Sequence, residues 1–254
     1  DLQDAQNEII AEIERLKGQQ GGLEANIEEL RSKADDLRGR VVPDAERMAQ
    51  IHQPILPTAG LPALGGPVDE QAWLEDVRQR IERAGFTFHK RLVYAFHTSL
   101  KIANYAPILV LAGISGTGKS ELPRLYADLG RLNFLELAVQ PSWDSPNDLF
   151  GFFNYTDGRF KAEPLTRLLQ QVKADEKLRQ TPSLVLLDEM NLARVEYYFA
   201  ELLSKLEARR GVERLGRTEE AIRRASVALN AGPGQPPEWI YLDERVHRFP
   251  RKSI

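Results

Sequence analysis

The chain contains no cysteine among its 254 residues, and this absence excludes disulfide bonds and metal sites with cysteine ligands. Long apolar stretches are also missing, since no run approaches the roughly 18 residues of a membrane-spanning helix. The opening Asp1-Leu-Gln-Asp is unlike a signal peptide. Neither sign of charge dominates, because 34 Lys and Arg residues stand against 37 Asp and Glu residues, which argues against a surface that coats nucleic acid. We therefore expect a cytoplasmic protein with one sizeable core and no membrane segment.

What the sequence does contain is a complete phosphate-binding loop, Gly113-Ile-Ser-Gly-Thr-Gly-Lys-Ser120, which fits the pattern G-x-x-x-x-G-K-[ST]. The apolar run 108–112 before it predicts a buried strand, and the amphipathic segment 122–132 after it predicts a helix. In this context, backbone N–H groups and a helix N-terminus bind a phosphate chain. A chance glycine-rich turn is the alternative, and the match at every position argues against it.

The residues of this loop have expected roles in binding a nucleotide. Lys119 adds a point charge for the β- and γ-phosphates, and Ser120 offers a hydroxyl to Mg²⁺. The implied cofactors are therefore a nucleoside triphosphate and Mg²⁺. The other candidate nucleotide contacts lie in the loop and at the start of the following helix: Gly113, Ser115, Gly116, Thr117, Gly118 and Glu121.

A pair of adjacent carboxylates, Asp188 and Glu189, forms the second chemical element. They follow the apolar run 183–187, at the C-terminal end of a predicted strand, where ligands of open α/β sheets bind. We expect Asp188 to hold Mg²⁺ through water and Glu189 to polarise the attacking water. A strand that ends in Asp-Glu is common, so a surface turn is the alternative; the phosphate loop earlier in the chain favours the catalytic interpretation.

Residues 1–42 carry a heptad pattern that predicts a coiled coil. Leucine or isoleucine recurs at every seventh position from Leu2 to Leu37, and the alternate positions of the seam are mostly apolar. Glycines within 18–22 weaken the helix, since each costs about 1 kcal/mol relative to alanine. One weakened helix, two helices folded back on each other, and a solvated helix lying on the core all remain open.

Between the heptad segment and the phosphate loop, the sequence predicts a linker and two helices. Residues 43–68 are rich in proline and glycine and are expected to form the linker. Helical spacing predicts helices over 69–84 and 88–103. His89 and His97 lie in the second of these helices without a carboxylate at ligand spacing, so we interpret them as surface or core-edge residues.

Beyond the helix that follows the loop, alternating patterns predict a strand at 133–139 and an aromatic β-hairpin around an Asp157-Gly158 turn. Helical spacing over 164–179 and 193–208 predicts two further helices, and 239–242 reads as a short strand.

Three stretches of sequence together resemble AAA+ ATPases of the helix-2-insert group, which includes McrB-like restriction motors, MoxR-like ATPases, midasin and dynein modules. These stretches are GISGTGKS, FGFFNYTDGRF and LVLLDEMNLARVEYYFAELLSKLE, and the DEMNLA run resembles McrB-like proteins in particular. The resemblance covers about 88–254 and implies an α/β fold: a P-loop parallel-sheet core with helices on both faces. We place the nucleotide-binding domain at 69–254, preceded by the coiled coil and linker.

The resemblance also implies residue roles. Lys119 and Ser120 match the Walker A lysine and hydroxyl, and Asp188 and Glu189 match the Walker B pair. Lys119 and Glu189 are therefore the expected catalytic residues, and Ser120 and Asp188 the expected metal ligands. The aromatic segment 150–160 matches a hairpin inserted in helix 2, which faces the pore or the substrate in relatives.

The partners implied are further copies of the chain in an AAA+ ring, DNA or a protein to be remodelled, and a nuclease subunit if the protein serves restriction or phage defence. ATP is the implied nucleotide, with GTP as the alternative, and the coiled coil implies a partner helix. The family's sensor asparagine, arginine finger and helical lid would follow Ile254. We therefore expect a domain truncated before these elements, so that activity of this part alone stays open.

Two other functions remain alternatives. An SMC-like ATPase is suggested by the coiled coil. In that class, however, the coil follows the phosphate loop and an LSGG-like signature precedes the acidic strand, whereas here the coil precedes the loop and the sequence between 120 and 184 has no such signature. A non-catalytic nucleotide-binding scaffold is the second, and the intact Lys119 and Glu189 argue against it. The arginines between 209 and 224 are interpreted as a solvated surface; a contact to a neighbouring subunit's phosphates or to nucleic acid is the alternative.

Overall fold

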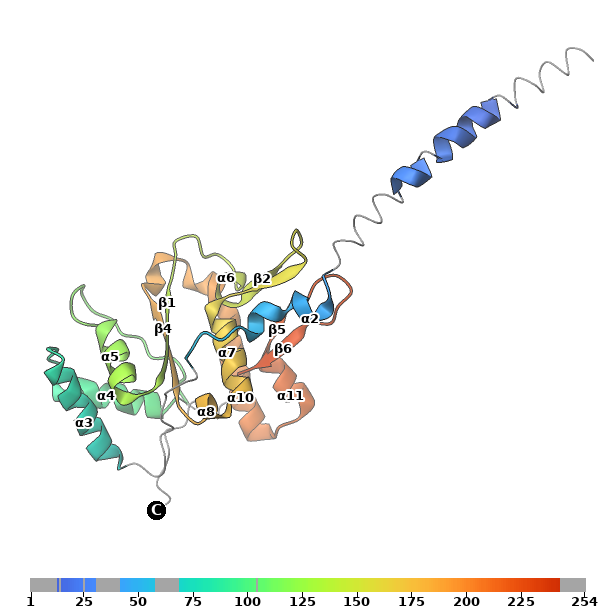
Figure 1. Ribbon diagram of the computed structural model, residues 1–254. Helices are drawn as coiled ribbons and strands as arrows, with labels where there is room; N and C mark the ends of the chain where they lie inside the picture. The colour runs from blue at the N-terminus through green and yellow to red at the C-terminus, as the bar shows by residue number, and fades with distance from the viewer. Residues whose placement is uncertain are drawn as a thin grey trace, which may run out of the picture.

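The computed structural model describes residues 13, 15–24, 26–30, 42–57, 69–103 and 105–242. Helical residues of the amino-terminal segment project away from a body of helices and short strands (Figure 1). Within the described ranges, no helix combines the length and the apolar character that crossing a bilayer requires.

Two parallel strands form the centre of the body, β1 (Asn133–Ala138) and β4 (Ser183–Asp188), which pair in register along their whole length. Successive side chains of a strand point to opposite faces. Leu137 accordingly joins one apolar cluster, whereas Phe134 and Leu184 pack against the other. The strand pair therefore separates two cores, one on each face.

Helices cover both faces of this strand pair, as the α/β prediction requires (Figure 1). α7 (Pro164–Ala174) packs on one face. α5 (Glu121–Gly130) packs on the other, with α3 (Glu70–Arg83) and α4 (Lys90–Lys101) behind it. The helices α3, α4 and α5 lie where helical spacing predicts them.

The apolar run 108–112, expected as a strand, is not one. Leu109 is 38% exposed and Val110 is 67% exposed, and no strand of the described residues pairs with this run. A strand needs a neighbour for its backbone N–H and C=O groups, so an apolar pattern alone does not create one. Ile108 and Leu111 still pack against the two cores, and the parallel sheet of the described residues has two strands.

Two antiparallel hairpins complete the strands of the described residues. β2 (Gly151–Asn154) pairs with β3 (Arg159–Ala162), and the predicted turn lies between them, with Gly158 at φ 63°. β5 (Ser226–Leu229) pairs with β6 (Glu238–Tyr241). The first hairpin and β6 follow the sequence prediction, whereas β5 is too short for its alternation to stand out.

The helix expected over 164–179 is divided into α7 and α8 at Asp175, whose carboxylate accepts hydrogen bonds from the first N–H groups of α8. The helix expected over 193–208 is likewise divided, with a break at Phe199 between two helices of which the second extends to Leu215. The remaining described helices are α2 (Asp44–Arg47), η1 (Ala49–His52), α6 (Asn147–Phe150), α8 (Glu176–Arg179), η2 (Met190–Leu192), α9 (Val195–Tyr198), α10 (Ala200–Leu215) and α11 (Glu219–Arg224).

Residues 44–57, expected as part of the proline- and glycine-rich linker, pack against the body. Ile51 is fully buried in the core that contains α7. The Gln171 side chain of α7 accepts hydrogen bonds from the N–H groups of Ile55 and Leu56, each at 2.9 Å. A buried apolar side chain, together with hydrogen bonds between backbone groups of this stretch and the Gln171 side chain, therefore holds a proline-rich stretch in place.

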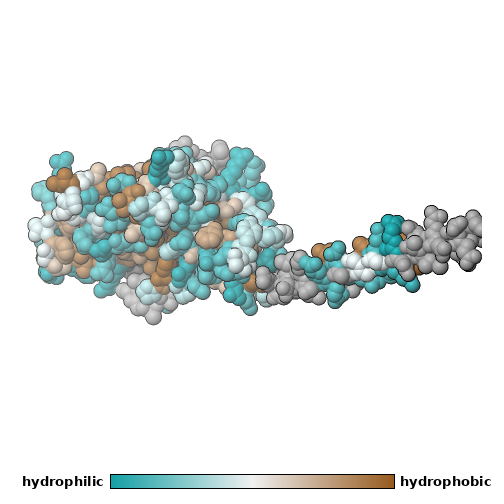
Figure 2. All heavy atoms as spheres, turned by 90° about the horizontal axis from the view of Figure 1, so that it is seen from above, coloured by the Kyte–Doolittle hydropathy of each residue, from teal (hydrophilic) through white to brown (hydrophobic). Residues whose placement is uncertain are grey.

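Only the middle of the heptad segment lies within the described residues; 1–12 and 31–41 fall outside them, as does the rest of the linker, 58–68. Helical residues 15–24 include the glycines at 18, 21 and 22. Seam residues of this helix face solvent, with Leu16 at 51% and Leu23 at 62% exposure, and apolar side chains are visible along it in Figure 2. Pairing of the coil stays a prediction.

Candidate functional site

The phosphate loop and the acidic strand meet at the C-terminal edge of the β1–β4 pair. Ser120 directly precedes the first residue of α5, and its Oγ donates a hydrogen bond to Oδ1 of Asp188 at 2.7 Å. Asp188 is the last residue of β4. Two motifs 68 positions apart in the sequence therefore form one site, at the sheet edge where α/β proteins bind ligands.

The phosphate loop itself is closed by its own side chains. The Lys119 ammonium donates a hydrogen bond to the carbonyl oxygen of Ile114 at 2.7 Å, and the Thr117 hydroxyl donates to the same oxygen at 2.9 Å. Gly116 and Gly118 both have φ of 79°, a conformation that side chains with a Cβ rarely adopt. Binding a triphosphate therefore requires Lys119 to exchange a carbonyl for phosphate oxygens.

The other predicted loop contacts lie in the same turn. Gly113 and Ser115 are exposed, and a Cβ on Gly113 would lie 3.4 Å from the Thr117 hydroxyl.

Glu121, in contrast, forms an ion pair with Arg124, with 2.5 Å between guanidinium nitrogen and carboxylate oxygen. The same guanidinium lies 2.8 Å from a carboxylate oxygen of Glu136, so that Arg124 bridges the two glutamates. The hydrogen bonds from Arg124 to Glu136 raise the pKa of the arginine. Sequence reasoning missed this bridge, although Glu136 stands out as the charged residue within the apolar pattern of β1.

Glu189 has an unusual backbone for a residue with a side chain, with φ 53° and ψ 38°. Its carboxylate is exposed, and its carbonyl accepts a hydrogen bond from the N–H of Leu192 at 2.9 Å. The Tyr198 hydroxyl donates to the carbonyl oxygen of Met190 at 3.0 Å, and burial raises the pKa of this tyrosine. Hydrogen bonds therefore hold the turn that follows β4, and the Glu189 carboxylate on this turn is exposed to solvent.

Comparison with known proteins gives the family. A family model described as AAA domain (dynein-related subfamily) matches residues 108–242, which is more than half of the chain. The chain belongs to this AAA family. Searches of curated proteins and of solved structures gave no match. The match includes the phosphate loop and Asp188, so the chain carries a P-loop NTPase domain of the AAA+ class.

A polar network ties the phosphate-loop helix of the AAA domain to α3 and α4. His97 is 2% exposed, and its Nδ1 lies 2.6 Å from the Tyr126 hydroxyl, while its Nε2 lies 2.8 Å from Glu70. Lys101 also reaches Glu70 at 2.7 Å. The interpretation of His97 as a surface or core-edge residue is therefore wrong: its imidazole fills a position between three helices.

Burial lowers the pKa of His97, and the hydrogen bond with Glu70 opposes this only in part. Burial alone would raise the pKa of Glu70, but the hydrogen bonds from Lys101 and His97 outweigh it, so that the pKa is lowered. The network is therefore arranged for a neutral imidazole beside an ionised carboxylate.

The arginines between 209 and 224 are not a uniformly solvated surface. Arg209 is 1% exposed. The guanidinium of Arg217 lies 5.6 Å from the ring centre of Tyr241, and that of Arg223 lies 5.3 Å from the ring centre of Trp239. Both contacts are within the range of cation–π interactions. Two of these arginines therefore stabilise the position of β6 in the AAA domain.

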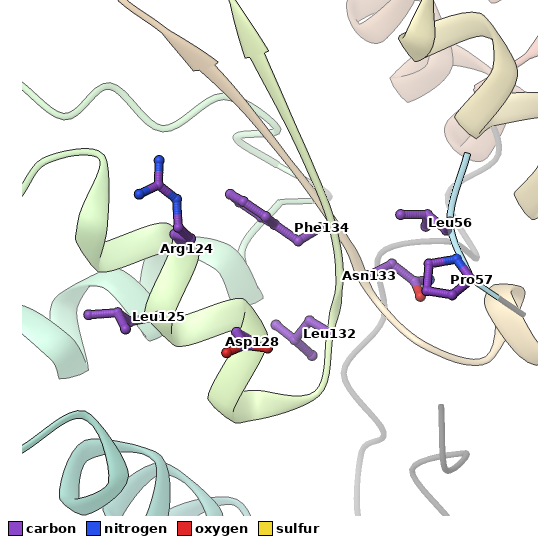
Figure 3. Close-up of a pocket in the computed structure, with 8 residues that line it drawn as sticks. All are labelled: Leu56, Pro57, Arg124, Leu125, Asp128, Leu132, Asn133 and Phe134. Atoms are coloured by element: carbon purple, nitrogen blue, oxygen red, sulfur yellow. The ribbon is translucent and has the colours of Figure 1, made fainter. Parts of the chain in front are cut away.

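A cleft of about 380 Å³ lies beside α5, along the side of the helix that leads to the start of β1 (Figure 3). It opens where β1 begins, whereas ligands of α/β sheets bind at the carboxyl ends of the strands. The cleft is therefore separate from the candidate site. Its lining consists of Leu56, Pro57, Arg124, Leu125, Asp128, Leu132, Asn133 and Phe134.

Proposed function

We propose that this AAA domain binds ATP with Mg²⁺ and hydrolyses it. The observation that carries the proposal is the hydrogen bond between Ser120 Oγ and Asp188 Oδ1. It brings a hydroxyl and a carboxylate, oxygen donors of the kind that Mg²⁺ prefers, to one point at the end of the phosphate loop. The site thus fits a metal–triphosphate complex better than a phosphate alone.

Each residue of the site has one role in this proposal. The loop N–H groups and Lys119 bind the β- and γ-phosphates, and Ser120 and Asp188 hold Mg²⁺, which would neutralise charge on the phosphate oxygens. Glu189 orients the attacking water and accepts its proton. Its exposed carboxylate and left-handed backbone support this role, because the turn directs the residue away from the line of β4.

ATP is the proposed nucleotide, and GTP is the alternative. No described contact of the site selects between the two bases, because Lys119, Ser120 and Asp188 all address phosphate or metal. Competition of unlabelled ATP and GTP against one fluorescent analogue distinguishes them.

We further propose that the protein is a cytoplasmic, ring-forming motor that remodels DNA or protein. AAA domains commonly assemble into rings, and the hairpin of β2 and β3 exposes aromatic side chains, with Phe152 at 44% and Tyr155 at 70%. Such residues suit contact with a substrate. The resemblance of the DEMNLA run to McrB-like proteins supports the finer proposal of restriction or phage defence with a nuclease partner.

Replacement of Lys119 by alanine tests nucleotide binding. Lys119 is the one cationic residue of the loop sequence 113–120, so Lys119→Ala should abolish measurable binding of a fluorescent Mg²⁺–ATP analogue. Loss of charge-assisted bonds of this kind weakens binding by about 10- to 100-fold or more. Lys173→Ala, on the exposed side of α7, is the matched control. An unchanged affinity in Lys119→Ala would contradict the proposal.

A further inference from the structure

The phosphate loop is exposed to solvent along most of its length. Residues 113–117 are exposed, and the side chains of Thr117 and Lys119 bond to a carbonyl within the loop. The N–H groups of such a loop must converge before they can bind phosphate. Ordering a mobile loop on binding offsets part of the binding free energy, so a contact that orders it beforehand raises affinity.

Phe88 supplies such a contact from outside the loop. A Cβ atom placed on Gly118 would lie 2.7 Å from Cε1 and 3.1 Å from Cζ of Phe88. The aromatic ring therefore lies directly against the backbone of the residue that precedes Lys119. Only glycine fits at this point, both for the space and for the φ of 79°.

Phe88 is itself held firmly in the connection between α3 and α4. α3 ends in a Schellman motif at Gly85, with φ 89° and both of its hydrogen bonds formed. His89 is the N-cap of α4, and its side chain accepts a hydrogen bond from the N–H of Arg91. Phe88 precedes this cap and Val93 lies at the fourth helical position, the spacing of a hydrophobic staple. Both belong to one apolar cluster, so the ring has a defined position.

The same pair of helices contacts α5 along its length. His97 of α4 bonds to Tyr126 in the middle of α5. At the far end, a Cβ on Gly130 would lie 2.9 Å from the Trp73 ring of α3. Close contacts that require glycine therefore occur at the loop and at the last residue of α5, which fixes the helix along its axis.

We propose that Phe88 is a positioning residue for the phosphate loop. Its ring fixes Gly118, and through it the direction of Lys119 and of the neighbouring N–H groups that receive the triphosphate. The inference rests on the proposed nucleotide binding. Stacking of an aromatic ring on the nucleotide base is a different role, and ligands with and without a base separate the two.

The experiment measures the affinities of the full chain for Mg²⁺–ATP and for Mg²⁺–tripolyphosphate, which has no base. Phe88→Ala should weaken both by a similar factor, about tenfold, because the lost preorganisation affects the phosphate contacts alone. Phe86→Ala changes an aromatic residue on the same connection that is 38% exposed, and should bind both ligands as the parent does. Phe88→Leu, which refills most of the space, should recover most of the affinity.

Two outcomes would overturn the inference. Parental affinities in Phe88→Ala, together with a lower unfolding temperature, would leave the ring a purely structural role. Weaker binding of ATP with unchanged binding of tripolyphosphate would assign the ring to the base. A parent chain that binds neither ligand would contradict the proposed function instead. If Phe88→Ala does not fold, Phe88→Leu and Phe88→Met allow the same comparison, with a smaller expected factor for both ligands.

Discussion

At the scale of single residues, the candidate nucleotide-binding groups lie apart from the proposed catalytic carboxylate of Glu189. Ser120 and Asp188 bond to each other, and Lys119 is folded onto its own loop. Glu189 stands outside these contacts on an exposed turn. A carboxylate that is free of the phosphate loop can change without loss of the loop's geometry, so substitution there should act on turnover.

Replacement of Glu189 by glutamine tests this separation. Glu189→Gln keeps the size of the side chain but removes the proton acceptor, so nucleotide binding should stay at the parental level. Turnover should fall by about 10²-fold or more, as for loss of a positioned base. Single-turnover hydrolysis and equilibrium binding are the two measurements. Hydrolysis at the parental rate would assign the water to another residue.

At the scale of elements, the network of Glu70, His97 and Lys101 links the stability of three helices to pH. His97 has a folded pKa below its ordinary value of 6.5, so its contribution to stability is present above about that pH and is lost as pH falls toward the folded pKa. Glu70 has a folded pKa below 4.5, so its contribution is lost only below that value. Two separate steps in acid stability follow.

The unfolding temperature of the parent should therefore decline between pH 7 and pH 5, by about 2–4 °C for each kcal/mol lost. His97→Gln keeps a polar group beside Tyr126 but cannot titrate, so its decline over this range should be smaller. His52→Gln changes an exposed histidine of η1 and should keep the parental slope. Equal slopes in all three proteins, measured by thermal unfolding monitored by circular dichroism, would exclude His97 as the titrating group.

Local chemistry explains which elements the sequence predicts correctly. The phosphate loop, α5 and β4 are predicted by motifs and apolar patterns within their own residues. The hairpin of β2 and β3 is predicted by the Asp157-Gly158 turn between its strands. The run 108–112 fails because a strand depends on a neighbour as well as on its own residues. Residues 44–57 fail for the opposite reason, since buried Ile51 and hydrogen bonds to Gln171 place a proline-rich stretch on the core. Contacts distant in sequence decide both cases.

The same limit applies within the site. Sequence reasoning identifies Lys119, Ser120 and Asp188 from their motifs, because these residue types at these spacings serve phosphate and metal. It does not identify Phe88, which precedes the phosphate loop by a whole helix. The contact with Gly118 exists only because the connection between α3 and α4 lies against the loop, where these helices and α5 share one apolar cluster. An aromatic residue next to an N-cap is the weak signal that was present.

At the scale of the whole molecule, the projecting helix offers a surface for association that is separate from the AAA domain (Figure 2). Its described apolar seam residues face solvent, with exposed fractions from 46% at Ile13 to 65% at Leu30. Exposed leucines at heptad spacing favour pairing with another helix. The glutamines at alternate positions of the seam, Gln6 and Gln20, leave the number of paired helices open. We expect this segment, rather than the nucleotide site, to determine association of the present chain.

Light scattering tests this expectation. The full chain should associate, and Leu16→Glu combined with Leu23→Glu should abolish association, because two charges in the seam oppose helix pairing. Glu28→Gln, outside the seam, is the control and should associate as the parent does. Removal of residues 1–42 should have the same effect as the double substitution. A nucleotide-dependent hexamer that persists after this removal would instead place the assembly surface in the AAA domain.

The pairing of β1 with β4 has a consequence for how the chain folds. Asn133 and Ser183 are 50 positions apart, so closing this pair costs loop entropy that a local hairpin does not. The intervening hairpin of β2 and β3 and the helix α7 make contacts close in sequence, which form on the microsecond scale. Asp188 reaches Ser120 only once β4 has docked beside β1. We therefore expect the proposed metal-binding end of the site to assemble late, so that binding of Mg²⁺–nucleotide would mark chains that have completed folding.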